Sequence, residues 1–579
     1  MPDLLSIETW RTLFTRHGSK LGWGLALLFG APLVVGFGVS QYANRANSAA
    51  EANVDRNAVV ATINGVPVTR QQYVALAFQD RTQVGEQAAV AQGAALQSLA
   101  QRIVIEQEAA SRKVGADDAE VDKAVQDFRT ERLGKDDAKD DAKWSEFLQG
   151  IGRTSGEFRQ EVSKSLLGPA LVNSYKSEIN VTEADAKNQS AEAKLQVVMI
   201  GVKSPMFPSR PGKGAQPLED AAAKAKAIEL QAQAKAGADL TSMAKMNSTD
   251  TATALKGGVL EWRPEYAASA QTGGVALGYG KDFDTEVHKT PNGQITGVVH
   301  QEGAMSAYLF AKVLERRNTL PKTFNAAKVI ATLKDEKAKE KVSQVIQDKT
   351  KAAKIEIKDP KIQTFYDYYR LKTAERAEMM AQFMPEAKKD ILPKEEVAKL
   401  QTSVDAGLET MLKADPNDTT AAQLLATSLE RKPQTPVTRD RMISLYETIL
   451  KGSENQQTRV KLAGLYRDKK DMVKAKEQFD QIAKIQGRKP IYNTESATEA
   501  KSTYTGLIGN YKSVNAPEDA AKMEQKLKLA TDKELQYKLE DLKNKSQNPQ
   551  PGNSNIQMPV PQSTPPPAPT ATPAPSGKR

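Results

Sequence analysis

The sequence predicts a mainly α-helical protein with four further features. They are a single membrane-spanning helix near the start, a small α+β domain inserted into a helical lobe, helical repeats in the C-terminal half and a disordered proline-rich tail. Apolar residues recur at helical spacing in residues 88–190 and 400–535. Strand-like and helix-like stretches alternate between residues 194 and 316. Nineteen uncharged residues run from Leu21 to Val39.

Composition narrows the classes of function. The chain has 579 residues, enough for several domains, and contains no cysteine, which excludes disulfides, thiol catalysis and cysteine-based zinc sites. The three histidines, His17, His288 and His300, are scattered, so we expect no metal and no cofactor. The net charge is +10, without the aromatic-interleaved basic patch of nucleic-acid binders. Lysine-rich helical surface accounts for this charge; attraction to acidic lipid or acidic client chains is the alternative.

The stretch LGWGLALLFGAPLVVGFGV, residues 21–39, predicts a membrane anchor. A helix of this length rises about 28 Å, close to the thickness of the bilayer's hydrocarbon core. Three basic residues closely precede the stretch and one follows it, so residues 1–20 are expected in the cytoplasm. The bulk of a single-pass protein of the inner (cytoplasmic) membrane would then lie in the periplasm or extracytoplasmic space. A signal peptide cleaved near Ser48 and Ala50 is the alternative, but the apolar core is long for one.

Residues 59–73, VVATINGVPVTRQQY, predict a strand, a tight turn, a second strand and a helix. Asn64 and Gly65 are the residue types that a type I′ hairpin turn requires. Thr69 and Gln72 have the spacing of a capping box at the start of a helix.

The following residues continue as helices up to about residue 190. Residues 134–143, GKDDAKDDAK, are too charged for a core and predict a solvated loop or helix edge. The apolar positions at helical spacing are Leu96, Leu99, Ile103, Val121, Val125, Phe128, Phe158, Val162, Leu166 and Leu167.

These segments together resemble the SurA-type periplasmic chaperones and their membrane-anchored PpiD-like and PrsA-like relatives. VVATINGVPVTRQQY resembles the opening of that family, LQSLAQRIVIEQEAASRKVGADDAEVDKAVQDF its next helices, and INVTEADAKN the exit into its isomerase domain. Residues 194–316 resemble a parvulin, a peptidyl-prolyl cis-trans isomerase, in AGADLTSMAKMNSTD, KGGVLEW, DFDTEV, NGQITGVV and FAKVLERR. The pieces follow the family's order over residues 55–360.

The resemblance implies a domain order. Residues 55–190 would form a SurA-like chaperone domain, residues 192–316 an inserted parvulin-like domain, and residues 318–365 the return helix and strand of the chaperone lobe. In that return, AKIEIKDP would pair with the N-terminal hairpin.

The resemblance also implies little or no isomerase activity. Active parvulins usually carry a His in the first strand, an Asp or Cys after the double glycine, and a second His in the last strand. Met199, Val259 and Leu309 stand at these positions as we align them, so the catalytic residues are unknown. His288 and His300 fall outside them, in a helix end and a loop. An active isomerase whose catalytic cluster this alignment misses is the alternative.

The apolar proline pocket of the family is better matched. Leu260 and Phe283 match its Leu and Phe, Tyr279 stands near its Met, and Trp262 follows as in the family's GGxLxW pattern. The resemblance therefore implies that these four residues bind substrate. The alternative is that they fill the core of a small domain.

Residues 366–540 predict a tetratricopeptide (TPR)-like helical region. The steps from Tyr466 to Ala475 and from Tyr511 to Ala520 both span nine residues. Such repeats present a concave face to a protein partner, which no residue here names. A generic helical bundle is the alternative. Residues 548–579 are too rich in Pro, Ser and Thr to pack, which predicts a disordered, partly polyproline tail.

The sequence therefore predicts a membrane-anchored extracytoplasmic chaperone that binds unfolded or nascent exported polypeptides and no nucleic acid. Its parvulin-type domain is expected to be weak or inactive. The alternatives are an active peptidyl-prolyl isomerase and a TPR-based assembly scaffold of the cell envelope.

Overall fold

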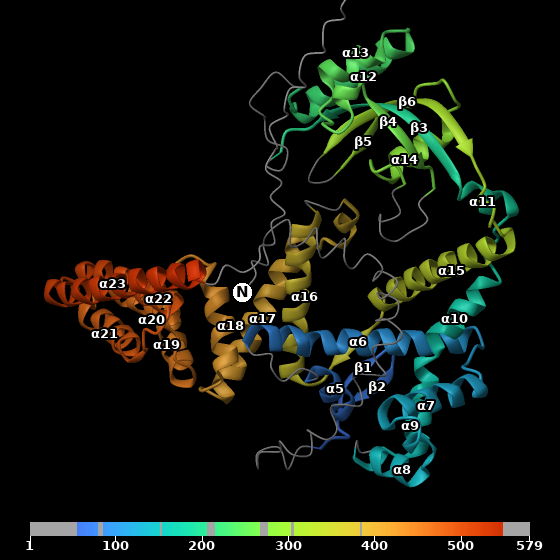
Figure 1. The fold of residues 1–579 in the computed structure, drawn as a ribbon. Coiled ribbons are helices and arrows are strands. Elements are labelled where there is room, and N and C mark those ends of the chain that lie inside the picture. The colour runs from blue at the N-terminus through green and yellow to red at the C-terminus, as the bar shows by residue number, and fades with distance from the viewer. Residues whose placement is uncertain are drawn as a thin grey trace, which may run out of the picture. The chain divides into compact units, whose positions relative to one another are not determined.

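The computed structural model describes residues 55–547 except 79–84, 151–152, 205–214, 267–275, 303–305 and 382–384 (Figure 1). The chain divides into two compact units, residues 1–428 and 429–579. The predicted anchor at 21–39 and the predicted tail at 548–579 lie outside the described residues. Within the described ranges, no helix is both long and apolar enough to cross a bilayer.

The first unit opens with the predicted hairpin, β1 (Val59–Ile63) and β2 (Val66–Thr69). Asn64 and Gly65 both have positive φ, 48° and 80°, as a type I′ turn requires. The capping box is also present: Thr69 caps α5 (Arg70–Ala77), and the Gln72 side chain accepts a hydrogen bond from the Thr69 N–H. The predicted hairpin and helix start are confirmed.

A third strand completes this sheet from far along the chain. β7 (Ile355–Ile357) pairs antiparallel with β1, in the order β2-β1-β7. The Asn64 side chain accepts a hydrogen bond from the Lys354 N–H at 2.9 Å, which fixes where β7 begins. The expected return of the chain to the hairpin is confirmed, and Val60, Ile63 and Tyr73 are buried in the core beneath it.

Helices make up the remainder of this lobe. They are α6 (Gly85–Ser111), α7 (Asp118–Leu133), η2 (Asp137–Lys139), α8 (Asp141–Gly150), α9 (Ser155–Ser165), α10 (Leu167–Lys176), α11 (Glu183–Asn188), α15 (Ala326–Lys351) and α16 (Pro360–Ala381). The charged stretch 134–143 forms η2 and the start of α8, and Ala138 in it is buried. A buried carboxylate joins three of these helices, because Glu108 of α6 contacts Tyr175 of α10 and Lys349 of α15.

Between α11 and α15 lies a small α+β domain. Its elements are β3 (Ala191–Gly201), α12 (Asp220–Lys235), α13 (Leu240–Asn247), η3 (Ala254–Lys256), β4 (Val259–Pro264), α14 (Lys281–Lys289), β5 (Val299–Gln301) and β6 (Ala307–Asn318). The four strands form an antiparallel sheet in the order β4-β3-β6-β5. α14 lies on one face of this sheet, and α12 and α13 lie on the other (Figure 1).

The remaining elements are helical. They are η5 (Pro385–Asp390), α17 (Lys394–Ala414), α18 (Thr419–Glu430), α19 (Pro436–Gly452), α20 (Gln456–Asp468), α21 (Met472–Arg488), α22 (Thr494–Ser513) and α23 (Pro517–Gln547). From α19 to α23 each helix packs against the next one along the chain. The residues that suggested a repeat, Tyr466, Ala475, Tyr511 and Ala520, are all buried.

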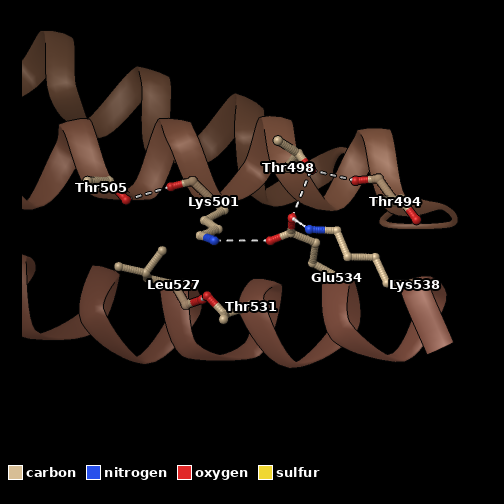
Figure 2. Close-up of polar contacts among 8 residues, drawn as sticks. All are labelled: Thr494, Thr498, Lys501, Thr505, Leu527, Thr531, Glu534 and Lys538. Carbon is tan, nitrogen blue, oxygen red and sulfur yellow. Dashed lines mark hydrogen bonds and ion pairs between the residues drawn. The ribbon is translucent and has the colours of Figure 1, made fainter.

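A buried carboxylate also joins α22 and α23 (Figure 2). Glu534 of α23 accepts hydrogen bonds from Lys501 at 3.1 Å and Thr498 at 3.3 Å, both on α22. Lys538, one turn further along α23, donates to it at 2.6 Å. These bonds from cationic groups hold the pKa of Glu534 down at about 2.

Candidate functional site

Two of the three positions that align with catalytic residues of active parvulins lie next to each other in the sheet of the inserted domain. Met199 of β3 and Leu309 of β6 are direct cross-strand partners. Val259 of β4 pairs with Gln196 and lies with Lys194 and Lys312 on the opposite side of the sheet. Met199 and Leu309 therefore share the α14 face, and Val259 does not.

The predicted pocket residues divide in a similar way. Leu260 and Phe283 are buried in the core under α14 together with Leu309, and Tyr279 packs against that core. The rings of Tyr279 and Phe283 meet edge to face, with centroids 5.3 Å apart. Trp262 stands apart, half-buried, with the Arg317 guanidinium 4.2 Å from its ring centroid.

The position of Phe283 depends on its neighbour in α14. Asp284 is buried and accepts hydrogen bonds from the backbone N–H groups of Ala276, at 2.6 Å, and Leu277, at 3.3 Å. Burial raises the pKa of Asp284, and the two N–H groups offset this in part. The carboxylate ties α14 to the segment before it, and Phe283 is fully buried, with 0% of its surface exposed.

Sequence reasoning missed one acidic residue at this site. The Tyr279 hydroxyl donates a hydrogen bond of 2.8 Å to Asp250, and the Thr253 hydroxyl donates to the same carboxylate. The MNSTD motif was recognised as part of the resemblance, but a single carboxylate in a loop gave no sign that it would meet an aromatic 29 residues later.

Side-chain hydrogen bonds fix the Asp250 loop beside Met199. The Met199 N–H donates to the Ser248 hydroxyl at 3.1 Å, and the Gly201 N–H donates to the Thr249 hydroxyl at 2.9 Å. The loop thus extends the edge of β3. Burial, and then the charge of Asp250, raise the pKa of Tyr279, so its hydroxyl keeps its proton and acts as a donor.

The two described histidines lie outside this cluster. His288 is in the last turn of α14, stacks on Tyr266 and contacts the Glu265 carbonyl through Nε2. His300 was expected in a loop but lies in β5, because Val299–Gln301 pairs with β6; its ring stacks on Tyr308.

The arrangement is therefore an apolar surface with one acid–hydroxyl pair at its edge. Met199 and the Tyr279 ring are half-buried and can contact an aliphatic ring, whereas Leu309 is fully buried in the core they pack against. The oxygens of Asp250 and Thr253 can take part in hydrogen bonds. In the described part of the chain, no group of three or more His, Cys, Asp or Glu side chains could hold a metal ion.

Comparison with known families identifies two regions. Residues 13–171 match the model of a SurA-like N-terminal domain, and residues 180–317 match that of a PPIC-type peptidyl-prolyl isomerase domain. No curated protein sequence matches the chain.

Three solved structures are similar to parts of the chain. The peptidylprolyl isomerase PrsA of Bacillus anthracis is 20% identical, with 44% of this chain and 96% of that chain covered and a TM-score of 0.24. PrsA of Bacillus cereus is 18% identical, with 54% and 99% covered and a TM-score of 0.26. The foldase PrsA of Streptococcus pneumoniae is 18% identical, with 54% and 100% covered and a TM-score of 0.19. TM-scores this low do not establish a shared overall arrangement.

Proposed function

Because this chain belongs to the SurA/PpiD/PrsA-type foldases, we propose that it is a membrane-anchored, extracytoplasmic chaperone whose isomerase domain binds proline-bearing segments with little or no turnover. Residues 21–39 would anchor it, with residues 1–20 in the cytoplasm. Its ligands would be unfolded or nascent exported polypeptides.

One observation carries the proposal of weak turnover: the cross-strand pair of Met199 and Leu309. Rotation about a peptide bond faces a barrier of about 18–20 kcal/mol. A catalyst must act on the amide through hydrogen bonds or electrostatics, and a thioether and an aliphatic side chain supply neither strongly. Met199 is half-buried and favours burial of an apolar ring against it, at about 25 cal/mol per Å², while Leu309 is fully buried beneath the surface.

A second candidate function is active prolyl isomerisation, and the Asp250–Tyr279 pair favours it. A carboxylate at the edge of an apolar surface can polarise a bound amide. Here it already accepts hydrogen bonds from Tyr279 and Thr253, which reduces what it can offer a substrate.

A protease-coupled isomerisation assay on the full-length protein separates the two. We expect a rate close to the uncatalysed one, together with measurable binding of an unfolded polypeptide. A large acceleration that Asp250→Asn abolishes and Lys235→Glu leaves intact would refute the proposal and establish the isomerase.

We further propose that residues 55–190 and 318–365 form one folding unit around the insert at 192–316. The pairing of β1 with β7 supports this. Replacing residues 192–316 with a short Gly/Ser linker should leave a cooperative helical melting transition. Its loss would mean that the insert is integral to the core.

The topology has its own test. A reporter enzyme that works only outside the cytoplasm, fused after residue 60, should be active in cells. Activity of a cytoplasm-specific reporter at the same position would contradict the proposed orientation.

We propose that residues 366–540 act as TPR-like repeats that bind a protein partner, and the buried repeat positions support this. An assembly scaffold of the cell envelope is the corresponding alternative. Deleting residues 429–547 should leave client binding intact if the chaperone proposal holds, and should abolish the protein's role if it is chiefly a scaffold.

A further inference from the structure

The two faces of the four-stranded sheet are covered unequally. α12 and α13 pack on one part of the face opposite α14, around Val198, Ile200 and Phe310. Further along β6, Lys312 alternates with Ala311 and Val313, which face the core under α14, so Lys312 points to the same side as α12 and α13. There the sheet borders an open cavity of about 700 Å³.

We call this cavity the trough. Six of the residues that line it carry the argument: Lys194, Lys256, Val259, Lys312, Leu314 and Glu315. It lies on the opposite side of the sheet from Met199, Leu309 and Phe283, and none of those three lines it.

Two adjacent β-bulges shape the trough. β3 pairs Lys194 with Glu315 and Leu195 with Val313, so Leu314 is an extra residue on β6. On the other side of β3, β4 also has one residue more than its partner opposite Lys194. Bulges re-aim side chains, and here two successive residues of β6, Leu314 and Glu315, line the same cavity.

The charges in the trough are incompletely matched. Lys194 is paired with Glu261 at 3.1 Å. Within the described chain, the ammonium groups of Lys256 and Lys312 have no hydrogen bond or ion pair, and neither does the carboxylate of Glu315. Two free ammonium groups against one free carboxylate, above the apolar side chains of Val259 and Leu314, favour a ligand that is both anionic and aliphatic.

We propose that the trough is a second binding site for unfolded polypeptide, specific for extended segments in which an acidic residue stands two positions from an aliphatic one. This inference rests on the proposed chaperone function and specifies one kind of client segment that the protein would bind. An extended segment suits the site because its residues i and i+2 point to the same side, so that a carboxylate can reach Lys256 or Lys312 while an aliphatic group two residues along lies on Val259 or Leu314. β4 is an edge strand of the sheet, and no other strand in the described part of the chain pairs with its outer side.

The test is a titration of the full-length protein with a labelled, proline-free peptide of about twelve residues in which Glu and Leu take turns at every second position, with Ser between them, so that both face the same side when the peptide is extended. A matched peptide carries Gln in place of every Glu. We expect the acidic peptide to bind at least about tenfold more tightly, with an affinity that falls as salt rises. Equal affinities for the two peptides would overturn the proposal.

The double variant K256E/K312E should weaken binding of the acidic peptide by about tenfold or more, because it reverses both free charges. The double variant K224E/K235E, which reverses two exposed lysines of α12 in the same domain, is the matched control and should leave binding unchanged. Equal losses in the variant and the control would reduce the effect to net charge and overturn the site.

Binding of an unfolded, proline-rich polypeptide without acidic residues separates this inference from the proposed function. If that polypeptide binds and the acidic peptide does not, only the trough is refuted. If neither binds, the chaperone function itself fails.

Discussion

Residues 55–381 are stabilised by contacts between segments that lie far apart in the sequence. Residues 429–547 are stabilised by contacts between helices that are neighbours in the sequence. In the first region, the Thr62 hydroxyl of β1 donates to Glu356 of β7, 294 residues further along the chain. In the second, α19 to α23 each pack on the next helix in sequence. A structure built from distant pairings is expected to unfold as a single cooperative unit, whereas a linear array of helices can unfold one helix at a time.

The largest effect should come from removing the distant partner. A chain that ends after residue 353 lacks β7 and α16, and should lose the cooperative unfolding of residues 55–190, because Ile362 and its neighbours complete that core. A chain that ends after residue 428 should retain it. Thermal melting followed by far-UV circular dichroism compares the two; an equal, sharp transition in the shorter chain would remove the basis of the comparison.

Substitution of two buried phenylalanines tests how far a local loss of packing destabilises the surrounding structure. Phe283 of α14 and Phe479 of α21 are 0% and 2% exposed, so replacing either with Ala should cost about 3–5 kcal/mol. Hydrogen exchange should show loss of protection throughout the inserted domain for Phe283→Ala, and loss centred on α20 to α22 for Phe479→Ala. Exchange that spreads equally far in both would contradict the difference in range.

Phe283→Ala also bears on the candidate site. A Phe283 side chain that contacts a client proline would lower client affinity with little change in melting temperature. Its complete burial instead leads us to expect a loss of stability, with binding lost only through unfolding.

Replacing each of two glycines with Ala should change the free energy of unfolding in opposite directions. Gly258 follows η3 with φ +82°, and an added Cβ would lie 2.4 Å from the Val197 carbonyl oxygen. Gly258→Ala should therefore cost more than the roughly 1–2 kcal/mol of a left-handed backbone. Gly506, inside α22, has nothing within 4 Å of an added Cβ, so Gly506→Ala should stabilise by roughly 0.5–1 kcal/mol. Denaturant unfolding of each variant measures both values.

The smallest effect concerns Glu534, the carboxylate that joins α22 and α23. Its pKa in the folded protein is about 2, below its ordinary value of 4.5. A lowered pKa contributes stability that is fully present above 4.5 and is lost as pH falls towards 2. Residues 429–547 should thus melt at lower temperature at pH 3 than at pH 6, and Glu534→Gln should flatten that dependence. An unchanged slope in Glu534→Gln would show that other carboxylates cause it.

The sequence predicted local structure well, because local structure has local causes. The turn at Asn64 and Gly65 and the capping box at Thr69 each depend on residues within a few positions of one another. The return of β7 to β1 followed from the family resemblance. So did the choice of Met199 and Leu309, which the sheet register places side by side.

The remainder depended on contacts that no short window contains. Strand side chains alternate between faces, so the register of β4 places Val259 away from Met199. The pair of Asp250 and Tyr279 joins two loops, and the bulge at Leu314 has no sequence signature comparable to an Asn-Gly turn.

The pairing of β1 with β7 also determines the order in which the parts of the chain can fold during synthesis. A ribosome adds about 5–20 residues per second, so β1 is made roughly 15–60 s before its partner strand exists. During that interval the inserted domain, whose strands lie between residues 191 and 318, can fold completely. The lobe that carries the insert is therefore the later of the two to mature. A newly made copy of the protein therefore passes through a stage at which its N-terminal hairpin still lacks the third strand of its sheet.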